Sequence, residues 1–307
     1  MSSEQVASDP VATPVTPATP VTPESAVVTW GNLAPDGSKV AYVIKRAGSP
    51  QSDLWRVNVD GTQRELLAQS VMGGMWAADA KTIAYTLFRE EAGEWALAIR
   101  AVGGPERLLS PWSRDSAFLA TDSTRDGTML LGSYLSPTSA PAVLALWTAA
   151  KPSSKPLRVS LELTNASLWQ AQFSPDMRWI ACVVQRHGSA QGVELVVGRV
   201  VDGKMGALTR IAADHVWPDK PKWAPDGRTL YFLSRHDAGD LFDLWGVRFA
   251  SERGPATAPF RVSRFDSPSQ LISPDLSNTD IGIAERWALL TIETLTGNIW
   301  TLDNVGE

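Results

Sequence analysis

Four arginines recur at almost the same place in a repeated segment of this sequence. Arg46, Arg89 and Arg186 each follow the aspartate of a repeated turn by ten residues, and Arg235 follows its aspartate by nine. A guanidinium carries a planar fork of donors that pairs with both oxygens of a carboxylate or phosphate. If the segments are copies of one structural unit, the four side chains share one face. The spacing then predicts a crown that binds an anion or an acidic peptide.

This arginine crown has a simpler alternative, in which charged residues at strand ends only keep the surface solvated. Acidic residues that could neutralise the guanidiniums lie close by in sequence, at Glu90, Glu91 and Asp237. The residue pattern alone leaves both interpretations open.

Motifs for nucleophilic, metal-dependent or phosphate-binding catalysis are missing from the sequence. His187, His215 and His236 lack His-x-x-x-His spacing, and the single Cys182 has no second cysteine for a metal pair or a disulfide. The stretch nearest to a nucleophile elbow, residues 188–192, has its serine in the wrong position, and no glycine-rich phosphate loop is present. We therefore expect no enzymatic activity, no cofactor and no metal.

The turn before each arginine belongs to a long internal repeat. Its marker aspartates follow one another at steps of 43, 47, 50 and 50 residues and are Asp36, Asp79, Asp126, Asp176 and Asp226. A sixth, eroded copy without the aspartate is expected at residues 281–290. Periods in this range indicate stacked or radial repeat architectures, and such folds serve mainly as binding surfaces.

Two columns of apolar residues predict a buried strand after each marker, because alternate strand positions share a face. Four residues after the marker stand Val40, Ile83, Leu130, Ile180 and Leu230. Six residues after it stand Tyr42, Tyr85, Gly132, Cys182 and Phe232. A further apolar column, farther along each copy, includes Leu54, Leu97, Leu146, Val196 and Leu244, with Ile299-Trp300 in the eroded copy. Four short strands per copy are typical of a β-propeller blade.

The Pro-Asp-Gly turns, the aliphatic-Ala-Tyr strands and the Leu-Trp strands resemble the WD-repeat-like blades of TolB-type propellers. Residues 259–268 and 295–300 also resemble the C-terminal end of propeller domains fused to bacterial protein kinases and transcription regulators. The resemblance covers about residues 27–303. It implies an all-β, six-bladed β-propeller of four-stranded antiparallel blades over residues 27–307, and it implies little about function.

Residues 1–26 are predicted to form a disordered Pro/Thr-rich tail or linker, because prolines recur through them without an apolar run. The third strand of the last copy is expected near residues 298–303. Its blade would then close with an N-terminal strand or remain three-stranded.

In such a ring, the loops into each first strand share a face with the loops between second and third strands. Trp169 and Trp217, with His215 nearby, precede innermost strands and would lie near the channel mouth on the crown face. Exposed aromatic side chains there would anchor a partner. The alternative is that they fill the gap between neighbouring blades.

The charge and hydropathy of the sequence argue against two classes of partner, nucleic acid and membrane. The formal net charge is −5 and no basic stripe is present, which argues against nucleic acid. No apolar run of about 18 residues and no signal-peptide pattern are seen, so we expect no membrane insertion, a cytoplasmic location and a monomer. The pattern favours a non-enzymatic scaffold or sensor for a protein, an acidic peptide or a small ligand. The alternative is a propeller that gates or accompanies a serine peptidase subunit.

Overall fold

The computed structural model describes residues 20–22, 27–46, 51–136, 140–150, 152, 155–159, 163, 165–188, 192–236, 241–264 and 270–294. Most of the predicted tail and the strand predicted near residue 300 lie outside the described residues. Regular structure in the described part is β, apart from one three-residue 3-10 turn, η1 (Leu276–Asn278). No helix there is long and apolar enough to cross a membrane.

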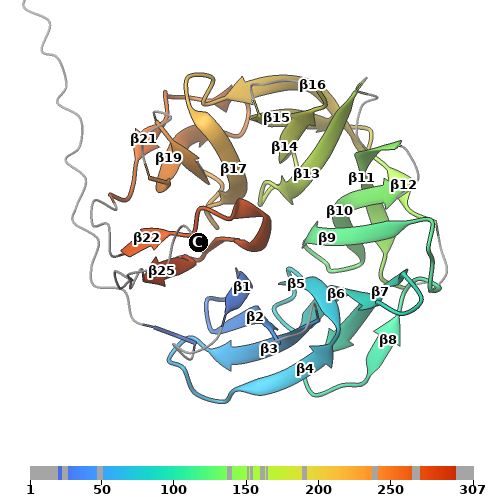
Figure 1. The fold of residues 1–307 in the computed structure, drawn as a ribbon. Coiled ribbons are helices and arrows are strands. Elements are labelled where there is room, and N and C mark those ends of the chain that lie inside the picture. The colour runs from blue at the N-terminus through green and yellow to red at the C-terminus, as the bar shows by residue number, and fades with distance from the viewer. Residues whose placement is uncertain are drawn as a thin grey trace, which may run out of the picture.

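Five antiparallel sheets radiate from a central axis, each built from consecutive strands (Figure 1). Blade 1 contains β1 (Val28–Leu33), β2 (Lys39–Lys45), β3 (Ser52–Asn58) and β4 (Glu65–Gln69). Blade 2 contains β5 (Val71–Trp76), β6 (Thr82–Arg89), β7 (Glu94–Ala101) and β8 (Glu106–Leu108). Blade 3 contains β9 (Ala117–Ser123), β10 (Met129–Ser136), β11 (Ala140–Thr148) and β12 (Leu157–Arg158).

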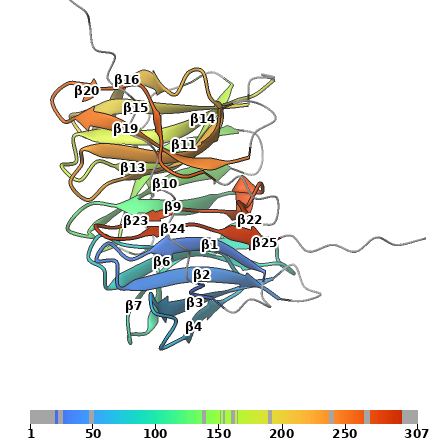
Figure 2. The same ribbon diagram turned by 90° about the vertical axis from the view of Figure 1, so that its left-hand side faces the viewer.

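Blade 4 contains β13 (Ala166–Phe173), β14 (Trp179–Arg186), β15 (Val193–Val201) and β16 (Lys204–Ile211). Blade 5 contains β17 (Val216–Trp223), β18 (Thr229–Arg235) and β19 (Asp243–Ala250), and its outer strand is split into β20 (Gly254–Pro255) and β21 (Phe260–Arg261). The strands run between two faces (Figure 2). We call the face with the turns between first and second strands the turn face, and the opposite one the crown face.

The sequence columns form the core between blades. Val40, Ile83, Leu130, Ile180 and Leu230 are all buried, as are Tyr42, Tyr85, Cys182 and Phe232 in the second column. Burial raises the pKa of the Cys182 thiol to about 12, so this cysteine is a core residue, as its column predicts. The packing of aromatic and aliphatic side chains from adjacent sheets holds the blades around the axis.

The Asp79-Ala80 turn forms although it departs from the Asp-Gly pattern. The Asp79 carboxylate accepts hydrogen bonds from the backbone N–H groups of Lys81 and Thr82, both at 2.8 Å. Ala80 takes a left-handed φ of 53°, at the place where Gly37 has a φ of 70°. The aspartate therefore defines the turn even where the glycine is missing.

The prediction of a sixth four-stranded blade is wrong for the described residues, which form five such blades. Residues 270–294, which we call the closing sector, contain two two-stranded ladders. One pairs β22 (Gln270–Ile272) with β25 (Ile292–Thr294), and the other pairs β23 (Gly282–Ile283) with β24 (Ala288–Leu289). The marker aspartate that fixes the other turns is absent here, and the strands are only two or three residues long.

The closing sector nevertheless completes the inner ring. β23 contacts both β1 and β17, and the sector lies between blades 5 and 1 (Figure 1). A Cβ on Gly282 would come within 2.4 Å of the Leu33 Cβ, so glycine lets the two backbones approach closely. Val21 of the predicted tail packs on the core that blade 1 and this sector share.

Candidate binding site at the channel mouth

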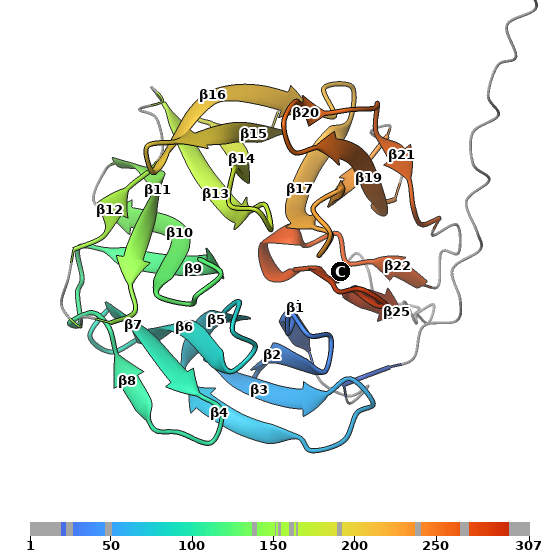
Figure 3. The same ribbon diagram turned by 180° about the vertical axis from the view of Figure 1, so that it is seen from behind.

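A cavity of about 290 Å³ opens where the inner strands reach the turn face. Every sector contributes to its wall, through Leu33, Trp76, Asp122, Phe173, Trp223 and Gly282. Each inner strand ends here before its turn, so the repeat itself brings equivalent positions around one axis (Figure 3). The cavity is therefore the turn-face mouth of the central channel, on the face opposite the arginine crown.

Four polar residues of the wall share one position of the repeat, four residues before the marker aspartate. They are Asn32, Asp122, Gln172 and Lys222, and blade 2 has Met75 at this position. Asn32 Oδ1 accepts a hydrogen bond from the Trp76 backbone N–H at 2.9 Å, and Asp122 Oδ2 accepts one from the Phe173 N–H at 2.6 Å. Both bonds cross to the next blade, so these side chains fix the wall by joining neighbouring blades.

The wall also contains buried charged side chains. Lys222 Nζ lies 3.3 Å from Asp280 Oδ2, and both side chains are largely buried, at 11% and 14% exposure. Asp280 lies two residues before β23, so this ion pair joins blade 5 to the closing sector. Burial raises the pKa of Asp122 to about 6, although backbone N–H groups of Phe173 and Ser123 and the nearby Lys222 oppose the rise.

The Asp122 carboxyl gives a testable pH dependence. Its folded-state pKa of about 6 exceeds the value of about 3.9 in an unfolded chain. The folded protein therefore holds the proton longer, and the contribution of Asp122 to stability falls as pH rises from about 4 to about 6. Asp122→Asn, which stays neutral, should gain stability relative to the parent over this range.

Urea unfolding of parent and Asp122→Asn at several pH values would measure this difference. Comparing the two proteins at each pH cancels the effects of all other carboxylates. A stability difference that stays constant from pH 4 to pH 7 would contradict the raised pKa.

Inside the channel, blades that are distant in sequence meet at one indole ring. Lys220 Nζ lies 5.7 Å from the centroid of the Trp30 ring, and a Cβ on Gly73 would come within 2.8 Å of the same ring. Trp30 and Lys220 occupy equivalent positions in β1 and β17, both with left-handed φ and both at a register shift. These bulges change the direction of the side chains, as bulges at functional rims often do.

Two arginines of the crown form ion pairs with acidic residues of their own β-hairpins. Arg46 donates to both carboxylate oxygens of Asp53, at 2.8 and 2.5 Å. Arg186 Nη2 lies 3.3 Å from the Glu194 carboxylate. In both cases an arginine at the end of the second strand pairs with an acid near the start of the third.

The other two crown arginines lie against aromatic rings. Arg89 is 3.9 Å from Glu94 and its guanidinium carbon is 3.7 Å from the Trp112 ring centroid. The Arg235 guanidinium carbon lies 5.0 Å from the centroid of the Phe242 ring. These partners differ from Glu90, Glu91 and Asp237, the acids that proximity in sequence predicted to neutralise the arginines.

Trp169 and Trp217 were predicted to precede inner strands, but they lie within the inner strands β13 and β17, toward the crown-face ends of these strands. Trp169 Nε1 donates to Gln185 Oε1 of the same blade at 3.1 Å. Trp217 is 41% exposed, yet it contacts blade 4, since a Cβ on Gly192 would come within 2.8 Å of its ring. The structure thus supports the gap-filling interpretation for part of Trp217 while leaving much of the ring accessible.

His215 is buried against aromatic neighbours in blade 5. Its ring centroid lies 4.3 Å from that of Trp245 and 5.6 Å from that of His236. Burial lowers its pKa, opposed by Asp214 and reinforced by His236. Within the described residues no three metal-ligating side chains gather.

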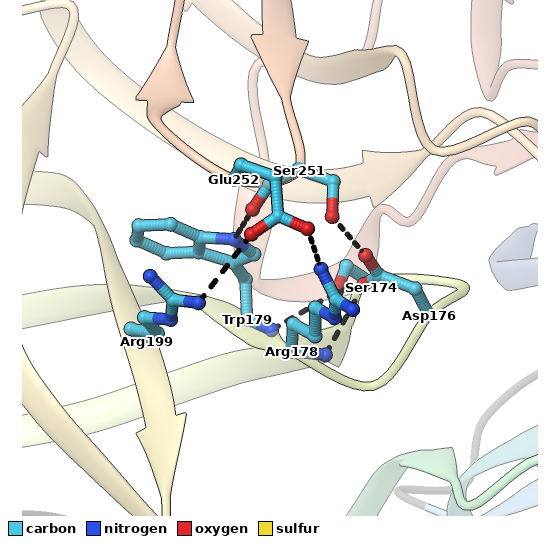
Figure 4. Close-up of polar contacts among 7 residues, drawn as sticks. All are labelled: Ser174, Asp176, Arg178, Trp179, Arg199, Ser251 and Glu252. Atoms are coloured by element: carbon cyan, nitrogen blue, oxygen red, sulfur yellow. Dashed lines mark hydrogen bonds and ion pairs between the residues drawn. The ribbon is translucent and has the colours of Figure 1, made fainter.

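Blades 4 and 5 share a polar seam on the turn face (Figure 4). Trp179 Nε1 donates to the Ser251 carbonyl at 2.7 Å, and the Ser251 hydroxyl donates to Asp176. Glu252 pairs with Arg178 and Arg199. A second hollow of about 620 Å³ lies along this seam. Because its walls are turn residues of which several are already paired, we assign the candidate site to the channel mouth.

The turn-face cavity and its residues were not among the sites predicted from the sequence. A signal was present, since Asn32, Asp122, Gln172 and Lys222 all stand four residues before a marker, within the inner strands. Polar residues repeated at one buried column indicate a shared polar surface.

No family model matches this sequence, and no curated protein matches it. Among solved structures, TolB from Acinetobacter baumannii is similar with a TM-score of 0.58 at 14% identity, over 85% of this chain and 62% of that one. The chain thus spans less than two thirds of that protein. A putative TolB from Agrobacterium tumefaciens is similar with a TM-score of 0.58 at 18% identity, over 79% of this chain and 82% of that one.

A propeller from a protease has a comparable likeness. The β-propeller domain of the Trilobed protease from Pyrococcus furiosus has a TM-score of 0.52 at 12% identity, over 87% of this chain and 79% of that one. Identities this low establish shared architecture only. The chain therefore has the β-propeller fold that these proteins share, with four-stranded antiparallel blades.

Proposed function

We propose that this chain is a non-enzymatic binding module that holds a protein or peptide partner at the turn-face mouth of its channel. The observation that carries the proposal is the cavity of about 290 Å³, to which all six sectors contribute. Its wall combines aromatic rings with hydrogen-bonding side chains. Ligand sites typically combine an apolar lining with a few positioned polar groups.

The hydroxyl groups at the mouth support a binding role over catalysis. Ser123 Oγ accepts from the Ala78 N–H at 2.8 Å and donates to the Thr124 carbonyl. Ser174 Oγ accepts from the Trp179 N–H and donates to Asp176. Both hydroxyls thus maintain the turns, and neither is paired with a histidine that could act as a general base.

A second candidate function is that of a propeller accompanying a peptidase. The likeness to the propeller domain of the Pyrococcus protease favours it. Under this alternative, the partner at the mouth would itself be a peptidase. The two functions are separated by the identity of the bound protein.

Ala78→Trp tests the proposed location. Ala78 is half-buried and lines the cavity, so an indole there should fill the mouth and abolish partner binding without removing a hydrogen-bonding side chain. The matched control is Ala92→Trp, in the crown-face turn between β6 and β7 of the same blade. Partners captured by parent and variants would be identified by mass spectrometry, after equal melting temperatures are confirmed.

The same experiment tests the alternative that the partner binds the arginine crown. A variant with Arg46, Arg89, Arg186 and Arg235 all replaced by alanine should retain the partners that Ala78→Trp loses. If the crown variant loses them and Ala78→Trp retains them, the partner binds the crown face and the proposed location is wrong. Since exposed ion pairs contribute about 1 kcal/mol or less each, the combined variant is needed.

A further inference from the structure

We propose that the turn-face cavity recognises a carboxylate attached to an apolar group, the chemistry that the C-terminal residue of a peptide presents. This inference rests on the proposed function and specifies its ligand. It follows from the hydrogen-bonding groups that remain available in the wall, from the charges at its rim and from the rings that surround it.

Several acceptors of the wall are already used by the protein. Asn32 Oδ1 takes the Trp76 N–H, and the two oxygens of Asp122 take the Ser123 and Phe173 N–H groups at 2.8 and 2.6 Å. The Gln172 amide donates to the Thr121 carbonyl at 2.5 Å, so it is also held within the wall. The protein therefore satisfies these groups without a ligand.

Donors, by contrast, remain available. Arg125 lines the cavity, is exposed, and makes no side-chain hydrogen bond or ion pair among the described residues. Lys222 has three N–H groups and one ion-pair partner, Asp280. A ligand that supplies acceptor oxygens would complement both cations.

Trp76 contributes a further donor, its indole N–H. It lines the cavity, is only 3% exposed, and its Nε1 has no hydrogen-bond partner among the described residues. The equivalent tryptophan of blade 5, Trp223, donates its Nε1 to the Gln172 carbonyl of the preceding blade at 3.3 Å. Buried donors are normally paired, so the contrast points to a missing acceptor near Trp76.

The lining next to these donors is apolar. Trp76, Phe173 and Trp223 supply rings, and Pro35, Pro175 and Pro225 line the same cavity from their turns. At about 290 Å³, the cavity is at the lower end of ligand pockets, which begin at about 300 Å³. It fits the end of a chain better than a continuous polypeptide, and capture of a terminal carboxylate is a recurring mode of peptide recognition.

Calorimetric titration with three probes tests the inference: N-acetyl-Ala-Ala-Leu with a free carboxylate, its C-terminal amide, and 4-methylpentanoate. We expect the acid peptide to bind and the amide to bind at least about tenfold more weakly, because charge-assisted hydrogen bonds are lost. Arg125→Gln should weaken the acid by about fivefold or more and leave the amide unchanged. Its matched control is Arg228→Gln, an exposed turn-face arginine that lines only the second hollow.

The indole N–H resonance of Trp76, assigned with Trp76→Phe, should shift on adding the acid peptide. Equal binding by 4-methylpentanoate and the acid peptide would support carboxylate recognition and identify a small molecule as its source. Equal affinity for acid and amide, or no binding by any probe, overturns the inference. The proposed function is decided separately by the Ala78→Trp and Ala92→Trp pair, so either proposal can fail alone.

Discussion

Gly132→Ala is expected to destabilise the propeller by about 3 kcal/mol or more, an overpacking effect at the upper end of those usually seen. A Cβ at this position would lie 2.2 Å from the Leu119 carbonyl oxygen and 2.9 Å from the Ala120 Cα. Both are backbone atoms of β9, which pairs with β10 through Gly132 and Ala120. No side chain can rotate away to relieve this contact, so β9 and β10 would have to separate.

The expected intolerance of a side chain at position 132 is the opposite of what the repeat predicts. The equivalent positions in the other blades hold Tyr42, Tyr85, Cys182 and Phe232, all buried, so a consensus design would place an aromatic residue here. We expect Gly132→Tyr to prevent folding of blade 3 rather than to stabilise it.

Thermal and urea unfolding would measure the loss, with Gly31→Ala as the matched control. A Cβ on Gly31 would meet only a Leu289 methyl group at 3.4 Å, which is ordinary packing, so this variant should cost less than about 1 kcal/mol. If both glycine variants melt like the parent, the close approach of β9 and β10 is not a constraint.

Lys222→Met should also destabilise the fold by about 3 kcal/mol or more, because it leaves the Asp280 carboxylate buried without its counter-ion. The two side chains are 11% and 14% exposed, so water replaces little of the lost interaction. The effect should be greatest in the closing sector, since Asp280 lies two residues before β23.

The double variant Lys222→Met/Asp280→Asn removes both charges and should recover most of the lost stability. Urea unfolding of the parent, both single variants and the double variant gives the coupling energy directly. The control is Arg178→Met, whose partner Glu252 is 68% exposed, and which should cost less than about 1 kcal/mol. A double variant as unstable as Lys222→Met alone would show that the buried pair is not the cause.

Most of the fold could be predicted from the sequence because the repeat encodes local rules. A marker aspartate bonds the backbone of its own turn, and the aliphatic residue four positions later faces the core. Both rules act within ten residues, so they hold in each of the five described blades. They hold even at Ala80, where the aspartate compensates for the missing glycine.

The sixth blade could not be predicted correctly because an eroded repeat still carries part of the pattern. Ile281 is buried and Gly282 belongs to a strand, as the column requires. Strand length, however, depends on having a partner edge, and among the described residues β23 pairs with the two residues of β24 alone. The inner position is therefore filled, while residues 270–294 do not form a four-stranded sheet.

The sequence by itself determined the all-β architecture, the turns and the buried columns, since these depend on residue type and short-range spacing. Only the tertiary structure decided which side chains come into contact with one another. It pairs Arg46 with Asp53 across a hairpin, and it brings Lys222 to Asp280 from another sector. Such contacts depend on how the ring closes, because curvature and register place residues that are distant in sequence at one axis. The inner strands converge at the turn-face mouth, where we propose the site, whereas binding at the arginine crown stays a prediction of the sequence.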